Sequence, residues 1–83
     1  MDFRLYPNPN EGSFQLQYRK ASSGGKVRLE LFDMMGRSLW KNEVQAQALA
    51  VSKEIQIEGL KPGRYVLRLL DGERSGRKIL VVK

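Results

Sequence analysis

Short runs in which apolar and polar residues alternate follow one another along most of the chain. Residues 13–19 carry an apolar side chain at every second position, and Lys26–Asp33 and Tyr65–Leu69 repeat the pattern. A period of two indicates a β-strand with one buried face and one solvated face. We therefore predict that these three stretches are strands of an antiparallel sheet.

Weaker runs suggest further strands, and turn-forming residues separate them about every 8–12 positions, a spacing typical of sandwiches. No stretch has a convincing helical period. Eighty-three residues suffice for one domain. We predict an all-β fold, an immunoglobulin-like antiparallel β-sandwich of about seven short strands. The additional expected strands are Phe3–Tyr6, Ser38–Val44, Val51–Ile57 and Ile79–Val82.

The segment Met34-Met35-Gly36 fits a three-residue hairpin loop that closes with glycine in the left-handed region. Asp33 and Arg37 would then face each other across the neck of the hairpin. We expect them to form a pair that closes the turn. A glycine-rich stretch, Ala21–Gly25, is expected to be a surface loop.

The same hairpin register would place Trp40 opposite Glu30, on the face that carries Phe32. Two interpretations of this aromatic pair stay open. Either the Pro-rich loop, Tyr6–Gly12, covers the two side chains or a bulge turns Trp40 inward, or they form an exposed surface that binds a partner.

Near the C-terminus, Pro62-Gly63 fits the centre of a type II turn. The tyrosine that follows, Tyr65, stands at a strand entrance, as in the tyrosine corner of immunoglobulin-like sandwiches. We expect its hydroxyl to bond a nearby backbone group.

Asp71-Gly72 should turn the chain into the last strand. A strict two-residue loop there would direct Lys78 to the core and Ile79 outward. We therefore expect one extra residue, as a longer loop or a bulge near Gly76, which would pair Tyr65 with Ile79.

Composition excludes several classes of function. The chain lacks cysteine and histidine and its acids are scattered, so we predict no enzyme activity, no metal and no cofactor. The net charge is +6, most of it from Lys61 onward, but these cations alternate with apolar residues as on a solvated sheet face. We expect no nucleic-acid partner. No apolar run is long enough for a membrane-spanning segment. We expect that the first residues are not a signal peptide, because Met1 is followed by Asp2 without a basic region or a long apolar region.

Three ordered blocks of residues resemble the type A C-terminal sorting domains of the type IX secretion system. They are Tyr6-Pro7-Asn8-Pro9 with Gly12 and Phe14; the run from Val27 to Arg37 that ends in Asp33-Met34-Met35-Gly36-Arg37; and Leu60, Pro62, Gly63 and Tyr65 with Lys78-Ile79-Leu80-Val81-Val82-Lys83. The resemblance covers almost the whole chain. The candidate signal residues that it implies within these blocks are Tyr6, Pro7, Asn8, Pro9, Gly12, Phe14, Asp33, Gly36, Arg37, Pro62, Gly63, Tyr65, Lys78, Ile79, Leu80, Val81, Val82 and Lys83.

The resemblance implies that residues 1–83 are a single sorting domain from the C-terminus of a larger secreted precursor. Its expected partners are the type IX outer-membrane translocon, a surface sortase and an N-terminally fused cargo. The cargo would cross the periplasm and end at the cell surface or outside the cell. The alternative is an immunoglobulin-like accessory module that binds a polymer or a cargo domain through Phe32 and Trp40, without a role in export.

The last strand carries a further expectation. Residues Ile79–Val82 are apolar and stand between Lys78 and Lys83. As an edge strand this segment would offer unpaired backbone groups to a partner by strand addition. We expect the export machinery to read it.

Overall fold

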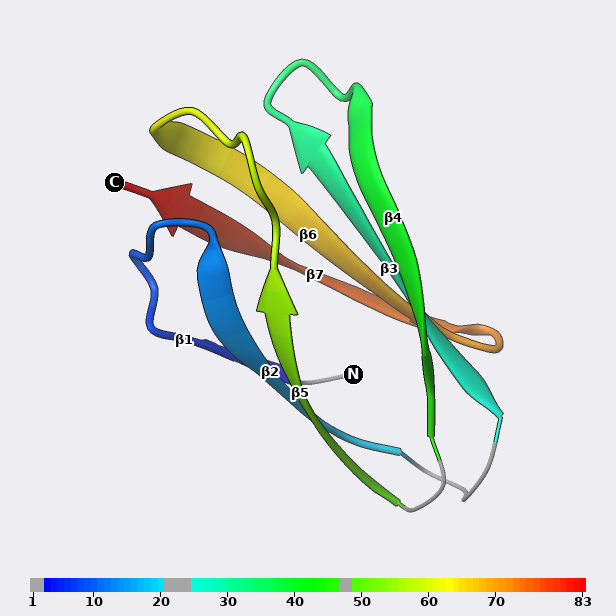
Figure 1. Ribbon diagram of the computed structural model, residues 1–83. Coiled ribbons are helices and arrows are strands. Elements are labelled where there is room, and N and C mark those ends of the chain that lie inside the picture. The colour runs from blue at the N-terminus through cyan, green and yellow to red at the C-terminus, as the bar shows by residue number, and fades with distance from the viewer. Residues whose placement is uncertain (1–2, 21–24, 47–48) are drawn as a thin grey trace.

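The computed structural model describes residues 3–20, 25–46 and 49–83, which form two antiparallel sheets packed face to face (Figure 1). The three-stranded sheet has the order β1-β2-β5, and the four-stranded sheet has the order β4-β3-β6-β7. No helix occurs in the described ranges. The predicted seven-stranded β-sandwich is confirmed. The strands are β1 (Phe3–Tyr6), β2 (Ser13–Arg19), β3 (Lys26–Asp33), β4 (Ser38–Gln45), β5 (Ala50–Gln56), β6 (Gly63–Asp71) and β7 (Arg74–Val82).

The core lies between the two sheets and is built from the alternating apolar positions. Leu16, Leu31 and Leu67 are completely buried, and each contributes about 1.5–3 kcal/mol through removal of its side chain from water. The predicted inward faces of β2, β3 and β6 are confirmed. The rest of the core comprises Phe3, Phe14, Tyr18, Val27, Leu29, Val44, Ala46, Val51, Ile55, Ile57, Tyr65, Leu69, Leu80 and Val82.

A bulge changes the register between β3 and β4. Phe32 pairs with Ser38 as expected, but Leu31 pairs with Trp40, which leaves Leu39 as the extra residue. Trp40 packs against the core, whereas Leu39 is 46% exposed. The interpretation in which a bulge turns Trp40 inward is therefore confirmed, and the alternative of an exposed surface shared by Phe32 and Trp40 is wrong, because the two rings lie on opposite faces of the sheet. The bulge places the large indole against the core, where its apolar area leaves water.

The hairpin of β6 and β7 also differs from the expectation. Asp71 pairs with Arg74 across a two-residue loop, Gly72-Glu73, and the ladder continues without a bulge to Gly63 and Val82. The expected extra residue near Gly76 is wrong. Tyr65 pairs with Leu80 rather than with Ile79.

This register directs Lys78 to the inner face, the outcome that the bulge was invoked to avoid. Because β7 is the outer strand of its sheet, the long side chain reaches past the sheet edge, and its ammonium lies 5.7 Å from the centroid of the Phe3 ring. An inward-pointing lysine on an outer strand also hinders pairing with other chains. The apolar alternation of β7 is satisfied by Leu80 and Val82, which are both buried.

The strand connections fall into two groups at the two ends of the sandwich (Figure 1). The motif end holds the loop 7–12, the turn 34–37, the connection 57–62 and Lys83. The opposite end holds the Gly72-Glu73 turn and the start of β1. The predicted surface loop Ala21–Gly25 lies mostly outside the described ranges, because residues 21–24 are not described. All three blocks of candidate signal residues therefore contribute to the motif end.

Candidate functional site

The Pro-rich loop lies along the outer edge of β7. The side-chain amide of Asn8 donates from Nδ2 to the carbonyl of Ile79 (2.9 Å) and accepts at Oδ1 from the amide of Val81 (2.8 Å). A carboxamide offers a donor and an acceptor, as a peptide group does. The Asn8 side chain thus stands in for one residue of a neighbouring strand.

The backbone of Asn10 extends this contact toward the C-terminus. Its amide donates to the carbonyl of Val81 (2.9 Å), and its carbonyl accepts from the amide of Lys83 (2.8 Å). These bonds form a short parallel bridge between Asn10 and Val82. The Pro-rich loop thereby covers the edge of the C-terminal part of β7, with the side chain of Asn8 and the backbone of Asn10.

The side chain of Asn10 holds the loop in shape. It is 3% exposed, donates from Nδ2 to the carbonyl of Pro7 (3.0 Å) and accepts at Oδ1 from the amide of Gly12 (2.8 Å). All of its polar groups are therefore bonded, as burial requires. Asn10 was not among the candidate signal residues predicted from the sequence. Its position between Pro9 and Gly12 was the available signal, since asparagine commonly bonds the backbone two residues ahead in turns.

Gly12 joins the loop to the end of β5. Its carbonyl accepts from the amide of Ile57 (2.8 Å), and its φ is +104°. A Cβ at this position would lie 2.7 Å from the carbonyl oxygen of Ile57. Only glycine tolerates both the backbone conformation and the close approach.

The expectation of an open edge at Ile79–Val82 is wrong. The Ile79 carbonyl, both backbone groups of Val81 and the Lys83 amide already bond the Pro-rich loop. Strand addition there would first have to displace Asn8 and Asn10. The sequence could not reveal this, because the two partners are more than 70 residues apart.

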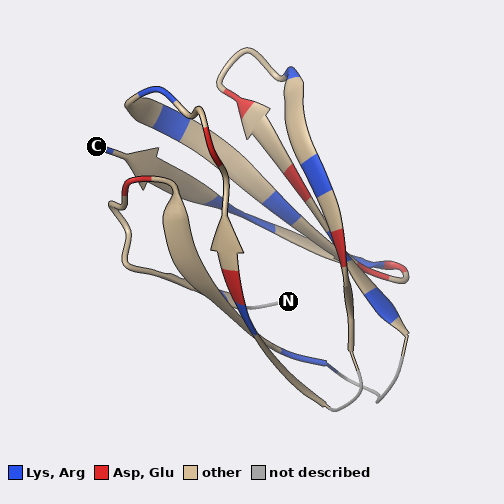
Figure 2. Ribbon diagram, viewed as in Figure 1, with Lys and Arg blue, Asp and Glu red and all other residues tan. Residues whose placement is uncertain are grey.

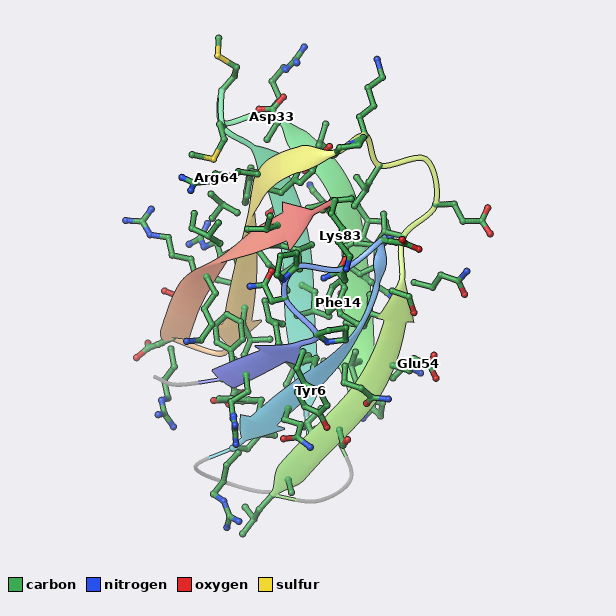
Figure 3. All side chains as sticks on the ribbon, turned by 90° about the vertical axis from the view of Figure 1, so that its left-hand side faces the viewer. Tyr6, Phe14, Asp33, Glu54, Arg64 and Lys83 are labelled. Carbon is green, nitrogen blue, oxygen red and sulfur yellow. The ribbon has the colours of Figure 1, made fainter. Side chains whose placement is uncertain are left out.

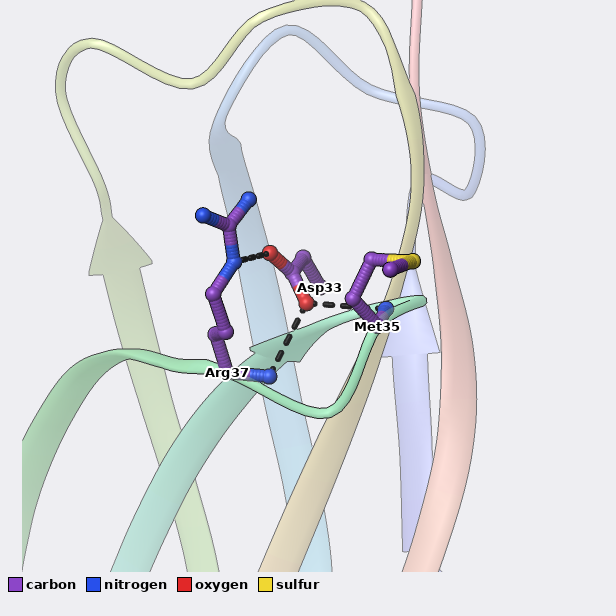
Figure 4. A network of polar contacts seen from close by, with 3 residues as sticks. All are labelled: Asp33, Met35 and Arg37. Atoms are coloured by element: carbon purple, nitrogen blue, oxygen red, sulfur yellow. Dashed lines mark hydrogen bonds and ion pairs between the residues drawn. The ribbon is translucent and has the colours of Figure 1, made fainter.

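The turn between β3 and β4 is closed by Asp33, as predicted (Figure 4). Its Oδ1 accepts from the amides of Met35 and Arg37 (both 2.9 Å), and its Oδ2 accepts from Arg37 Nε (2.7 Å). The hydrogen bond from the backbone amide of Arg37 has the largest effect on the Asp33 carboxyl and lowers its pKa. The hydrogen bonds from the Arg37 guanidinium and the Met35 amide also lower this pKa. Gly36 has the expected positive φ, +87°.

This turn projects its side chains into solvent. Met34 is 59% exposed and Met35 is 84% exposed. The Asp33 carboxylate bonds groups within the turn itself, while the thioethers of Met34 and Met35 are accessible to a partner.

The tyrosine corner is present at the start of β6. The hydroxyl of Tyr65 donates to the carbonyl of Lys61 (2.5 Å), which ties the strand to the connection before it. The predicted turn at Pro62-Gly63 is wrong: the turn lies at Glu58-Gly59, and Gly63 already belongs to β6.

The candidate signal residues thus differ in what they do. Phe14, Leu80 and Val82 are core, whereas Tyr6 is 44% exposed and its hydroxyl accepts from Gln17. Ile79 is 43% exposed on the outer face. The Pro-rich loop, the Asp33–Arg37 turn, the Tyr65 corner and the end of β7 come together at the motif end, while Lys78 lies farther down β7.

A charged network at the opposite end was missed by the sequence analysis. The ammonium of Lys20 lies 2.5 Å from Oδ1 of Asp71, and the hydroxyl of Tyr18 donates to Oδ2 (2.9 Å). The side chains of Lys20 and Asp71 are only 3% and 14% exposed. The parity of both strands was the available signal, because Lys20 follows the inward face of β2 and Asp71 that of β6.

The network shifts the pKa values of its members. The bond from Lys20, followed by that from Tyr18, lowers the pKa of the Asp71 carboxyl despite its desolvation. Burial, together with the bond to Asp71, raises the pKa of the Tyr18 phenol. The network therefore ties β2 to β6 with a charge pair that is formed at neutral pH.

Two other kinds of feature, a metal site and a membrane-spanning helix, are absent from the described residues. No group of three or more acidic, histidine or cysteine side chains that could hold a metal occurs within residues 3–20, 25–46 and 49–83. The same residues form no helix that is long and apolar enough to cross a membrane.

One known protein family matches the sequence of this chain. The model of the secretion system C-terminal sorting domain matches residues 4–83, and this family is the C-terminal sorting signal of type IX secretion. No curated protein matches the chain. The matched residues include both the Pro-rich loop and β7, the strand whose outer edge the loop covers. The chain belongs to the family of secretion system C-terminal sorting domains.

Proposed function

We propose that residues 1–83 form the C-terminal domain of a larger exported precursor, and that the type IX outer-membrane translocon recognises the motif end. A surface sortase then commonly removes the domain, and the cargo stays at the cell surface or leaves the cell. The observation that carries this proposal is the gathering of the three motif blocks at one end of the sandwich (Figure 1).

The course of the chain supports this assignment of roles. Phe3 pairs with Tyr18 near the opposite end, whereas Lys83 lies beside Asn10 at the motif end. A cargo joined before Phe3 would therefore be distant from the Pro-rich loop and the turn 34–37. Such a precursor could present the motif end to the translocon without obstruction.

The coupling between the first and last motif blocks supports recognition of a folded surface. Asn8 and Asn10 hold the backbone of Ile79, Val81 and Lys83 in place. The C-terminal residues thus reach the translocon in one defined conformation, which reduces the ordering cost of binding.

The test fuses residues 1–83 to the C-terminus of a periplasm-targeted reporter in a bacterium that has a type IX system. We expect the reporter to reach the cell surface. A short soluble tag appended after Lys83 should leave the core intact, because a terminus usually tolerates extension, but should reduce export. Surface labelling and fractionation measure both outcomes.

The matched control carries the same tag between the reporter and Met1, which leaves the motif end unobstructed. It should be exported like the untagged fusion. Retention of the untagged, folded fusion in the periplasm would contradict the proposed function. Normal export of the fusion tagged after Lys83 would contradict recognition at the motif end.

A further inference from the structure

The outer face of β6 and β7 combines arginines with apolar side chains. Reading from the motif end, the cross-strand pairs are Arg64–Val81, Val66–Ile79, Arg68–Arg77 and Leu70–Ser75. Arg64 lies outside the sandwich, whereas Phe14 lies between the sheets (Figure 3). This face is thus an apolar pair, Val66 and Ile79, with arginine on both sides along the strands.

Arg68 and Arg77 stand directly opposite each other. Both backbone groups of Val81 point away from β6, toward the Pro-rich loop, so by alternation those of Arg77 do too. Such positions form the non-hydrogen-bonded pairs of a ladder, in which side chains are closest. Like charges in this arrangement oppose folding. The two arginines are therefore not explained by stability.

The other half of the same sheet, β3 and β4, carries acidic as well as basic residues (Figure 2). Lys41 lies 3.7 Å from Glu30, and Glu43 lies 3.4 Å from Lys26 and 3.7 Å from Arg28. Among the residues that the structure describes, no acid lies within ion-pair distance of the arginines on β6 or β7.

Glu30 is the acid nearest in register to these arginines, since it pairs with Arg68 across β3 and β6. Its Oε2 instead accepts from Ser38 (2.7 Å) and faces Lys41. Within the described ranges, no ion pair therefore neutralises the arginines on the outer face of β6 and β7.

An open groove of about 560 Å³ crosses this face beside the turn 34–37. Phe32 and Val66 supply apolar lining, and Met34 stands at the turn. Arg68 and Arg77 supply two positive charges, while the one acid in the lining, Asp33, is bonded by Arg37. The half-buried Phe32 and Val66 would lose their remaining contact with water if the groove were filled. Methionine at its end can adapt to different apolar shapes.

We propose that this groove docks an acidic protein segment of the export machinery that carries apolar side chains between its carboxylates. Arginine forks match carboxylates in pairs, and the apolar lining requires side chains that enter the groove. A flat anionic lipid surface would meet the arginines but would leave the hollow unfilled. The inference rests on the proposed function and names the chemistry of the partner.

The test measures binding of a synthetic peptide of alternating glutamate and leucine to ¹⁵N-labelled chain 1–83. We expect the amide resonances of Phe32, Val66 and Ile79 to shift. Arg68→Gln/Arg77→Gln should weaken binding about tenfold, because two charge-assisted contacts are lost. The same variant should be no less stable than the unmodified chain, since the change removes a like-charged pair. Loss of affinity without loss of stability separates docking from a structural role.

The matched control is Arg4→Gln/Arg19→Gln on the outer face of the three-stranded sheet, which lowers the net charge by the same amount. Its affinity should stay within twofold of the unmodified chain. A lysine–leucine peptide should not bind. Equal weakening by both double variants would overturn the proposal in favour of unspecific charge attraction. Binding to phosphatidylglycerol vesicles but not to the acidic peptide would overturn it in favour of a lipid surface.

Export of the reporter fusion separates this inference from the proposed function. Export of the unmodified fusion together with retention of Arg68→Gln/Arg77→Gln supports the groove. Equal export of both fusions would overturn the groove's role and leave the sorting function intact. Failure of the unmodified fusion would overturn the proposed function itself, while the peptide titration would still decide whether the groove binds acidic segments.

Discussion

The two ends of the sandwich are held by different chemistry. At the motif end, the neutral side-chain amide of Asn8 binds the backbone of β7, and that of Asn10 binds the backbone of the Pro-rich loop. At the opposite end, Lys20, Asp71 and Tyr18 form a charged network between the sheets. Neutral amides satisfy backbone groups without a large desolvation cost, whereas a buried charge is tolerated only while its partner is present.

The difference separates two roles. Of the candidate signal residues, none belongs to the charged network, whose removal should affect stability alone. The motif end both holds the last strand and displays exposed side chains such as Met35. Substitutions at the motif end should therefore form two groups: those that lower the free energy of unfolding and those that leave it unchanged.

The largest effect is expected from Asp71→Asn. The change leaves the ammonium of Lys20, which is 3% exposed on its side chain, without a carboxylate. Loss of one partner of such a pair should lower the free energy of unfolding by about 3 kcal/mol. Urea unfolding at pH 7 measures it. A decrease below about 1 kcal/mol would mean that the network behaves like an exposed pair.

Acid titration provides the control for this variant. The pKa of Asp71 is lower in the fold than its ordinary value of 3.8, so its stabilising contribution is complete above that value and is lost as the pH falls below it. Asp33 acts in the same direction at the motif end. Between pH 5 and pH 2 the unmodified chain should therefore lose more stability than Asp71→Asn. Parallel curves would contradict the assignment.

A smaller effect is expected from Asn10→Ala. It removes two side-chain bonds and strands the amide of Gly12 and the carbonyl of Pro7, which should lower the free energy of unfolding by about 2 kcal/mol. Asn8→Ala is the matched comparison at an exposed site and should cost about 1 kcal/mol. Equal costs would contradict the central role of the buried Asn10.

Tyr65→Phe should cost about 1 kcal/mol, because the hydroxyl loses its bond to the carbonyl of Lys61 while the ring stays in the core. Urea midpoints at an unchanged m-value give the difference. An unchanged midpoint would show that water replaces the bond without loss.

The smallest effect is expected from Met35→Ser. The side chain is 84% exposed, so the free energy of unfolding should change by less than about 0.5 kcal/mol. Thermal and urea unfolding together measure it. A decrease above about 1 kcal/mol would show that the Met35 side chain stabilises the fold. The motif end would then not divide into residues that stabilise the fold and exposed residues that do not.

Local pattern predicted much of this protein. The period of two located the inward faces of β2, β3 and β6, and the spacing of Asp33, Gly36 and Arg37 predicted the hairpin turn. These features depend on residues close together in sequence, whose preferred backbone conformations and side-chain directions are set within the strand or turn itself.

Tertiary structure alone decided the remaining features. The bulge at Leu39 depends on space for the Trp40 indole beside the core, and the register of β7 depends on an edge past which Lys78 can reach. The cover over β7 depends on Asn8 and Asn10, more than 70 residues away. Sequence alternation determines which side chains point inward within a strand, but only the packed sheets decide which edges meet and where a charged side chain finds water or a partner.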